Sequence, residues 1–434
     1  MERQYKDSGI EWIGRIPREW NTTAIKQLMY LYAGATPKSD KEDFWDGDIV
    51  WITPADYKTE DVFISKGRRN ISAKGMESCA TTLLPINSII FSKRAPIGLV
   101  VLNSEPLCTN QGCIGCIPKK EKAYSKYYYY ALSAFTEQFE LYGAGTTFKE
   151  ISTSNFANFL LPFPQIEEQQ RIAEYLDVKC GEIDGLIALQ EQMISQLTDY
   201  KQSVITESVT KGLNSDVELV PSGIDWIGYV PKGWKVMPLK WLLRSPLQYG
   251  ANESGVLYDD TLPRYVRITD ILNNNLREDL QKLSLTEEQA NGYILENNDI
   301  LFARSGGTVG KTFIFKEKYG RCAFAGYLIR AQIVSACSSE YIYYYTQSQS
   351  YDEWKKQIFI QATIQNIGAD RYSTLEVPVP PLDEQRAIVS YLDAKCGEID
   401  RLIETKRQKI ETLKEYKKSI IYEAVTGKTD LRNS

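Results

Sequence analysis

The chain contains one stretch that resembles a phosphate-binding loop. Residues 299–315 read DILFARSGGTVGKTFIF, with Gly310, Lys311 and Thr312 in the order that such loops use to hold nucleotide phosphates. The spacing does not fit, because only three residues separate Gly306 from Gly310 where the motif needs four. KTFIF also has the pattern of a strand, not of a helix whose N-terminus faces a phosphate. We therefore expect a strand–loop–strand hairpin, with a nucleotide-hydrolysing site as a minor alternative.

The corresponding stretch of the first half, IIFSKRAPIGLVVL (89–102), also carries cations on its loop. Lys93 and Arg94 stand there, and Arg304 and Lys311 stand in the second half. Cations on a glycine-containing loop suit contact with a phosphate backbone or a base edge. On residue types alone, a solvated surface turn explains them equally well.

The remaining candidates for chemistry are weak. Histidine is absent, which removes Ser-His-Asp and Cys-His catalysis and imidazole ligation of metals. Cys108, Cys113 and Cys116 include one C-x-x-C pair, but a zinc site needs four ligands, so buried free thiols are expected and no metal. A methyltransferase would need a glycine-rich cofactor loop and an N/D-P-P-Y/F-like edge, and the sequence has neither.

A nuclease is suggested by the D-x-K spacing of Asp177 with Lys179, which recurs as Asp393 with Lys395. Both pairs fall in helical patterns, and no second acid is placed to share a metal ion with either aspartate. We therefore expect these residues to lie on a solvated helix face. The absence of histidine weakens every enzyme hypothesis without eliminating one.

The chain is an internal duplication. SGIEWIGRIPREW (8–20) recurs as SGIDWIGYVPKGW (222–234), and residues 164–210 are identical to residues 380–426 at 25 of 47 positions. Between these segments the halves agree only faintly, with IVWIT (49–53) aligned to YVRIT (265–269). Two long repeats favour pseudo-twofold symmetry over a solenoid, which needs at least three repeats.

The closely repeated segments have the pattern of long helices, because apolar residues recur along them at three- and four-residue steps. An apolar seam of roughly 60–70 Å needs a partner, and the other copy is the obvious one, in an antiparallel coiled coil. Short apolar runs broken by Gly and Pro make the intervening regions mixed α/β (α+β). The expected division is globular regions at 1–163 and 214–379, and helices at 164–213 and 380–434.

Composition and charge bound the remaining possibilities. The chain has 43% hydrophobic and 25% charged residues, and no signal peptide or membrane-spanning run, so a cytoplasmic protein with no membrane contact is expected. A net charge of −5 argues against nucleic acid, but segment 164–213 alone carries 4 basic and 9 acidic groups. A near-neutral globular region can still concentrate cations on one face.

In combination, SGIEWIGRIPREW, DIVWITPAD, the F-[SA]-[KR] hairpins and PPLDEQRAIVSYLD…EIDRLI resemble the specificity subunits of type I restriction–modification systems. The resemblance covers essentially the whole chain, including the order variable domain, repeated helix, variable domain, repeated helix. The helices with proline, EQ, YLD and IDxLI are specific to that family in combination, whereas any one short motif is weak.

This resemblance implies a non-catalytic DNA reader whose two target-recognition domains each read one half of a bipartite, asymmetric duplex target, with the paired helices as spacer. It implies two modification subunits that carry S-adenosylmethionine and methylate adenine. It also implies restriction subunits that use ATP and Mg against unmodified DNA such as that of a phage. No cofactor is expected on this chain. The alternative is a coiled-coil adaptor that reads no DNA sequence.

The resemblance does not fix the residues that read bases, so the candidates rest on residue chemistry. Hydroxyls, amides and cations on loops can bond bases or phosphates, and they can equally cap turns. The candidate DNA contacts are Thr36, Lys38, Trp51, Thr53, Lys93, Arg94, Thr146, Thr147, Lys149, Arg267, Thr269, Arg304, Lys311, Gln361, Thr363 and Gln365.

The helices are the candidate docking surface for the modification subunits, because near-identical helices beside divergent domains suggest two equivalent sites. The candidate residues are Ile172, Leu176, Ile183, Leu186, Leu197, Ile388, Leu392, Ile399, Leu402 and Leu413. Aspartate at Leu197 or Leu413 is expected to release the partner while the globular regions stay folded.

Overall fold

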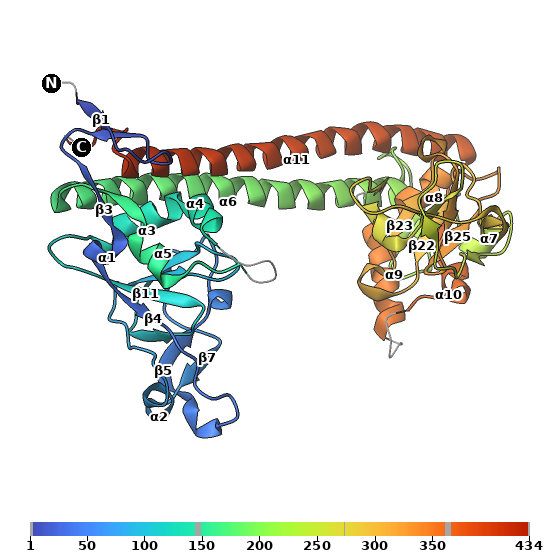
Figure 1. Ribbon diagram of the computed structural model, residues 1–434. Coiled ribbons are helices and arrows are strands. Elements are labelled where there is room, and N and C mark those ends of the chain that lie inside the picture. Colours follow the sequence, from blue (N-terminus) through green and yellow to red (C-terminus); the bar gives the residue numbers. More distant parts are fainter. Residues whose placement is uncertain (1–2, 144–148, 273, 361–365, 433–434) are drawn as a thin grey trace. The chain divides into compact units, whose positions relative to one another are not determined.

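The computed structural model describes residues 3–143, 149–272, 274–360 and 366–432 (Figure 1). Contacts divide the chain into two compact units, one made of Met1–Gln190 with Gln408–Ser434 and the other of Glu191–Arg407. Each unit therefore combines one globular region with parts of both repeated segments. None of the helices in the described ranges is both long enough and apolar enough to cross a membrane.

The repeated segments form the two long helices that the sequence predicts, α6 (Ile166–Lys211) and α11 (Leu382–Val425) (Figure 1). In the first unit, Lys417 of α11 pairs with Asp184 of α6 at 2.7 Å. In the second unit, Lys201 of α6 pairs with Asp400 of α11 at 2.7 Å. Adding 216 to the α6 residue numbers of one pair gives the α11 residues of the other, so the duplication extends to contacts.

The helices run antiparallel where the first unit brings them together. Arg171, near the start of α6, donates from Nε to the carbonyl of Leu431 at 3.3 Å, and Asp184 meets the earlier residue Lys417. Position numbers thus fall along one segment as they rise along the other. Buried apolar residues of both helices share a single core cluster with the globular region.

The first globular region is built from short strands and helices. The strands are β1 (Tyr5–Asp7), β2 (Arg15–Pro17), β3 (Asn21–Ala24), β4 (Met29–Ala33), β5 (Trp45–Ile52), β6 (Phe63–Ile64), β7 (Arg69–Ile71), β8 (Ile89–Ser92), β9 (Val100–Asn103), β10 (Leu107–Thr109), β11 (Cys113–Pro118) and β12 (Leu160–Phe163). The helices are α1 (Ile25–Leu28), α2 (Ala73–Glu77), α3 (Ser125–Ala134), α4 (Thr136–Leu141) and α5 (Thr153–Asn158).

The second globular region has the same kind of composition. Its strands are β13 (Leu219–Pro221), β14 (Tyr229–Pro231), β15 (Lys235–Pro238), β16 (Gln248–Tyr249), β17 (Val256–Leu257), β18 (Arg264–Val266), β19 (Ile271–Leu272), β20 (Asn275–Leu276), β21 (Leu283–Ser284), β22 (Ile300–Ala303), β23 (Thr312–Ile314), β24 (Cys322–Phe324), β25 (Leu328–Ala331) and β26 (Glu376–Val379). Its helices are α7 (Glu287–Ala290), α8 (Ser339–Tyr345), α9 (Gln349–Ile360) and α10 (Ala369–Ser373).

The two globular regions share one sheet plan. The order β4-β11-β8-β9 in the first matches β16-β25-β22-β23 in the second, and the parallel pair β5-β10 matches the parallel pair β18-β24. The pair β3-β12 likewise matches β15-β26. Because the sequences between the repeats agree only faintly, this plan shows one fold beneath two divergent surfaces. The fold is the mixed α/β duplication that the sequence predicts.

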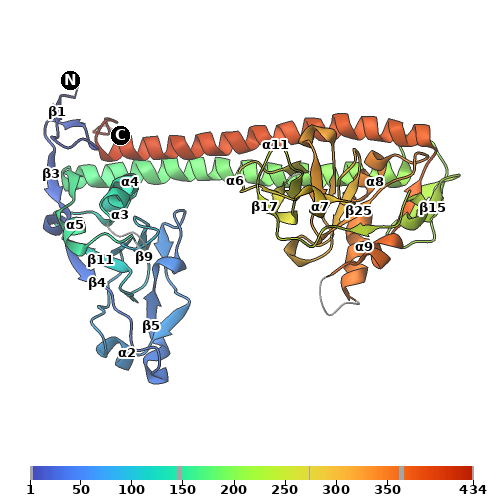
Figure 2. The ribbon, with the colours of Figure 1, turned by 45° about the vertical axis from the view of Figure 1, so that its right-hand side comes forward.

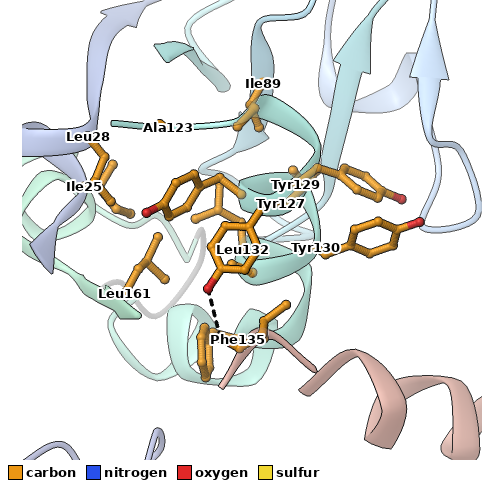
Figure 3. Close-up of a cluster of buried hydrophobic side chains, with 14 of the residues drawn as sticks. Ile25, Leu28, Ile89, Ala123, Tyr127, Tyr129, Tyr130, Leu132, Phe135 and Leu161 are labelled. Carbon is orange, nitrogen blue, oxygen red and sulfur yellow. Dashed lines mark hydrogen bonds between the residues drawn. The ribbon is translucent and has the colours of Figure 1, made fainter. Parts of the chain in front are cut away.

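A tyrosine in each unit joins the globular region to a long helix. The buried Tyr127 of α3 donates its hydroxyl to the carbonyl of Val425 at the end of α11, at 3.0 Å, and Figure 3 draws it among its apolar neighbours. The buried Tyr341 of α8 donates in the same way to Val209 at the end of α6, at 3.0 Å. A buried hydroxyl needs such a partner. Each globular region thus holds the end of the helix encoded by the other half.

The EQ dipeptide of each repeat makes a second joint. The indole N–H of Trp20 donates to Glu168 at 2.8 Å, and that of Trp234 donates to Glu384 at 3.1 Å. In the first unit α3 lies beside α6 (Figure 2), and Gln169 of α6 accepts from the backbone N–H of Tyr124, just before α3. These contacts explain why the tryptophan motif and the helix start are the repeated segments, since each binds the other.

Candidate nucleic-acid interface

The polar turn Asn110–Gly112 gathers the candidate segments of the first unit. Thr36 donates its hydroxyl to the side-chain oxygen of Gln111. A Cβ atom at Gly112 would lie 3.1 Å from the ring of Pro54, and the backbone N–H of Lys93 donates to the Gly112 carbonyl at 2.9 Å. The loop that carries Thr36 and Lys38 (TPKSD, 36–40), the turn after β5 (WITPAD, 51–56) and the cationic hairpin therefore meet at one place. Only the turn-forming letters TNQG marked this segment in the sequence.

The segment before α5 completes this surface. The backbone N–H of Ile151 donates to the carbonyl of Lys93 at 3.0 Å, and Arg94 forms an isolated β-bridge with Glu150. Glu150 and Ile151 thus lie against the hairpin. Thr146 and Thr147 fall outside the described residues, and Lys149 is exposed.

Glu150 holds both hairpin cations. Lys93 Nζ lies 2.8 Å from Glu150 Oε1, and Arg94 Nε lies 2.8 Å from Oε2. The side chain of Lys93 is 13% exposed and that of Arg94 is 46% exposed. Hydrogen bonds from Lys93 and then Arg94 keep the pKa of Glu150 below its usual value, against the effect of burial. The carboxylate is therefore ionised at neutral pH.

The second unit repeats the frame with other side chains. The backbone N–H of Arg304 donates to the carbonyl of Tyr327 at 3.1 Å, and the N–H of Ile367 donates to the carbonyl of Arg304 at 2.9 Å. Arg304 thus takes the place of Lys93, and its guanidinium carbon lies 4.8 Å from the centre of the Tyr249 ring. Its Nε is buried and makes no hydrogen bond within the part of the chain described. Asn366 replaces Glu150 in the bridge, opposite Ser305.

The sequence reasoning missed the two tyrosines of this second surface. Tyr327 is 64% exposed and Tyr249 is 41% exposed, so each presents an aromatic face beside Arg304. Other aromatic residues such as Tyr30 and Trp241 are also exposed, and no spacing in the sequence distinguished Tyr249 and Tyr327 from them. Gln361, Thr363 and Gln365 lie outside the described residues.

Two candidate residues of the first unit support its backbone. Trp51 is 8% exposed, and its indole N–H donates to the carbonyl of Ala35 at 3.0 Å. The hydroxyl of Thr53 accepts the N–H of Ala55 and donates to Asp56 at 2.8 Å, which caps the 3-10 turn that follows β5. Their side chains are therefore occupied within the chain. Their use as DNA contacts stays a prediction, although neither side chain is fully exposed.

Arg267 caps the matching turn of the second unit, after β18. Its backbone N–H donates to Asp270 at 2.7 Å, and its guanidinium donates to the same carboxylate at 3.0 and 2.8 Å. Arg267 therefore corresponds to Thr53, an offset of 214, whereas the alignment of IVWIT with YVRIT paired it with Trp51. The gapless alignment of IVWIT with YVRIT was therefore wrong. The equivalent residues are the two that cap the 3-10 turns, Thr53 and Arg267. The candidates left with exposed side chains include Thr36, Lys38, Lys149, Thr269 and Lys311.

The phosphate-loop-like stretch is the predicted hairpin. β22 pairs antiparallel with β23, and Thr312 begins the second strand. Gly310 has φ +80°, and its carbonyl accepts the hydroxyl of Tyr351 at 2.9 Å. The geometry is that of a tight turn, without the helix that would face a phosphate.

Substitutions in this turn separate its folding role from nucleotide binding. Gly310→Ala is expected to lower the free energy of unfolding by about 1–2 kcal/mol, because positive φ is unfavourable for alanine. Its Cβ would also lie 2.3 Å from Cδ of Lys355. Lys311→Ala should change stability by less than about 0.5 kcal/mol, since the side chain is exposed. Thermal unfolding and ATP titration of both variants check this, and tight ATP binding lost in Lys311→Ala would contradict it.

Most of the predicted docking residues on the helices are interior. Ile172, Leu176 and Ile183 are at most 4% exposed and belong to the core cluster of the first unit. Leu413 also packs against that cluster, and Leu197 is half-buried. In the second unit, Ile388, Leu392 and Ile399 are at most 2% exposed. The buried residues and Leu413 stabilise the chain itself, so aspartate at Leu413 would disturb the first unit.

Leu186 and Leu402 are the exceptions, and they are matched by the repeat. Each is 46% exposed. Tyr200 and Tyr416, also matched, are 49% and 57% exposed. An apolar pair repeated on the two helices is the kind of surface that a partner present in two copies can use.

The aspartates of the two D-x-K motifs accept hydrogen bonds from tyrosines. Asp177 accepts the hydroxyl of Tyr130 at 2.8 Å, and Asp393 accepts that of Tyr344 at 2.6 Å. Each aspartate thus binds its own globular region, and Asp393 is also exposed, as expected of a solvated helix face. Lys179 pairs with Glu182 at 2.8 Å.

The cysteines of the first unit are packed thiols. Burial raises the pKa of Cys108 to about 11 and that of Cys113 to about 12. Cys116 is fully buried, and burial raises its pKa too. Over the described ranges, no three His, Cys, Asp or Glu side chains are grouped as metal ligands would be.

Comparisons with known proteins agree on one family. A family model described as the type I restriction modification DNA specificity domain matches residues 17–198 and again 231–415. The type I restriction enzyme MjaIX specificity subunit of Methanocaldococcus jannaschii is 30% identical over 320 residues, covering 70% of each chain. The putative MjaX specificity subunit of the same organism is 26% identical over 438 residues, covering 96% of this chain and 95% of that protein.

Solved structures share the fold. One, described as "Structural basis underlying complex assembly and conformational transition of the type I R-M system", aligns with a TM-score of 0.73 at 15% identity, covering 95% of this chain and 99% of that chain. The crystal structure of the HsdS subunit from Thermoanaerobacter tengcongensis aligns with a TM-score of 0.51 at 15% identity, covering 95% and 98%.

Proposed function

Because the chain belongs to the family of type I restriction–modification specificity subunits, we propose that it reads a bipartite duplex DNA target, one half-site for each globular region. Members of the family are non-catalytic parts of restriction–modification complexes, and this chain is a subunit of that kind. The absence of histidine from the sequence agrees with such a role. A cytoplasmic location stays a prediction.

The observation that carries the proposal is the repeated frame with different side chains. The same backbone contacts hold Lys93 in one unit and Arg304 in the other. Beside them stand Glu150 in the first unit, and Asn366 with Tyr327 in the second. One frame with two sets of donors, acceptors and aromatic faces suits the reading of two different half-sites.

Replacing both Lys93 and Arg94 by alanine tests this reading. The duplex probe carries the motif found by mapping methylated adenines in cells that express the chain with its modification subunits. Binding is expected to weaken, and the slope of log affinity against log salt should become shallower by about 1 to 2 if both cations contact phosphates. Changes in base preference should fall in one half-site only.

The matched control replaces Lys120 and Lys122 by alanine, which removes the same charge from the turn before α3, away from the hairpin. That variant should bind almost as the parent does. If the parent complex binds every duplex alike, the adaptor alternative is correct. If the Lys93 and Arg94 variant relaxes preference in both half-sites, the modular reading is wrong.

We propose further that two modification subunits dock on α6 and α11, at matched sites that include Leu186 and Leu402. S-adenosylmethionine would then be held by those partners, and ATP and Mg by restriction subunits that join the same complex. The two matched helix surfaces support a partner present twice.

A further inference from the structure

The charge of the first candidate surface is partly cancelled from within. Glu150 contacts Lys93 and Arg94 at 2.8 Å each, so one carboxylate occupies two cations at once. Its two oxygens are divided between them, Oε1 to lysine and Oε2 to arginine, as two oxygens of a phosphate would be. The side chain of Glu150 is 33% exposed, so solvent reaches the carboxylate that holds the two cations.

At the equivalent position, the second surface carries an uncharged residue in place of the carboxylate. Asn366 occupies the bridge position that Glu150 occupies in the first unit, and asparagine carries no charge. Among the residues described, no carboxylate lies within ion-pair distance of Arg304, whose guanidinium rests on Tyr249. The two surfaces therefore differ by one negative charge, that of Glu150, at an equivalent point of the fold.

We propose that Glu150 is a resident counter-ion that a phosphate of the first half-site displaces from Lys93 and Arg94, so that it weakens DNA binding by the first globular region. The inference rests on the proposed function, since it specifies how one of the two surfaces binds its half-site. Asn366, at the equivalent point of the second surface, has no charge with which to compete.

The surroundings favour an exchange of partners over a movement of the loop. Ser92 donates its hydroxyl to the carbonyls of Arg94 and Pro96, and backbone bonds tie Lys93 to Gly112 and Ile151. The hairpin backbone is thus fixed, and only the side chains need to turn. Partly exposed ion pairs are weak, so a phosphate can replace the carboxylate. Once displaced, Glu150 lies close to that phosphate and repels it.

The test is the affinity of the complete complex, with Glu150→Gln in this chain, for a fluorescent duplex that carries the mapped motif. The variant is expected to bind about three- to tenfold more tightly at low salt, with a salt slope steeper by about one, because one repelling charge is lost. The gain should shrink as salt rises. The reciprocal change, Asn366→Glu, should weaken binding in the same salt-dependent way.

Two controls isolate the mechanism. Glu121→Gln makes the same change in net charge on an exposed turn of the same region and should leave affinity within twofold, roughly the level expected of a distant surface charge. With Lys93→Gln and Arg94→Gln already present, Glu150→Gln should give a clearly smaller gain, because no cation is left to be released and only the direct repulsion is relieved. Thermal unfolding of each variant shows that the fold is retained.

The outcomes are distinct. Unchanged or weaker binding by a folded Glu150→Gln complex, while the parent binds its motif, overturns the counter-ion and leaves the proposed function standing. A gain of equal size from Glu121→Gln also overturns it, since the effect would then be one of net charge. A parent complex without sequence preference would refute the proposed function, and the inference with it.

Discussion

A fragment of residues 1–213 is expected to fold only as a twofold dimer. In the full chain the first unit is completed by Gln408–Ser434, and the fragment lacks them. Without them Tyr127 loses its acceptor at Val425, and the core cluster of the first unit loses Ile420, Ala424 and Val425. Exposing that much of a core is expected to cost several kcal/mol, comparable with the whole stability of a domain.

A second copy of the fragment can supply what is missing. Val209 corresponds to Val425, and Lys201 corresponds to Lys417, the partner of Asp184. Two copies can therefore exchange helix ends across an isologous interface. The net charge of −5 on segment 164–213 opposes this at low ionic strength, so added salt should favour the dimer.

Sedimentation equilibrium and a melting temperature that rises with protein concentration would establish the dimer. Val209→Asp places a charge where the full chain buries Val425 completely, so this fragment should be monomeric and largely unfolded. With modification subunits, the dimer should methylate a palindrome made of the first half-site and its inverted copy. A fragment that melts cooperatively as a monomer at every salt concentration contradicts the prediction.

The second large effect is expected on assembly. The double variant Leu186→Asp with Leu402→Asp should lose both modification subunits, and adenine methylation with them. Both leucines are 46% exposed, so the isolated chain should change in stability by less than about 1 kcal/mol. Each single variant should retain one partner, because the two sites are matched by the repeat.

Co-purification and mass photometry of the complex give the number of bound partners. Leu141→Asp is the matched control, since this residue of the first globular region is 82% exposed and lies off the long helices. Leu176→Asp shows how loss of folding would appear, because a charge at a fully buried position should unfold the first unit. Full assembly and normal methylation by the double variant would show that the partners bind elsewhere.

The sequence predicts the long helices and the duplication well, because periodicity and repetition are local signals. It does not predict which apolar residues face a partner. Leu176 and Leu186 look alike in the pattern, yet one is fully buried and the other is 46% exposed. The difference arises from the globular region that packs on the helix, and that packing is decided by residues far away in the chain.

The candidate surface shows the same division. Lys93 and Arg304 were identified from residue type and loop position, whereas their neighbours Gln111 and Tyr327 were not. Those neighbours reach the surface through backbone pairing between segments about 20 residues apart. The carboxylate of Glu150 likewise meets its two cations across more than 50 positions. The pattern of a single sequence does not show which distant segments pair in the fold.

The matched joints of the two units bear on how new DNA specificities arise. Trp20 with Glu168 and Trp234 with Glu384 are the same joint, made from segments that both halves of the gene encode in closely similar form. A crossover between two such genes within these segments exchanges a whole globular region and leaves its attachment intact. On the proposed function, one such event changes one half of the recognised DNA sequence, and every gene before and after it encodes a folded subunit.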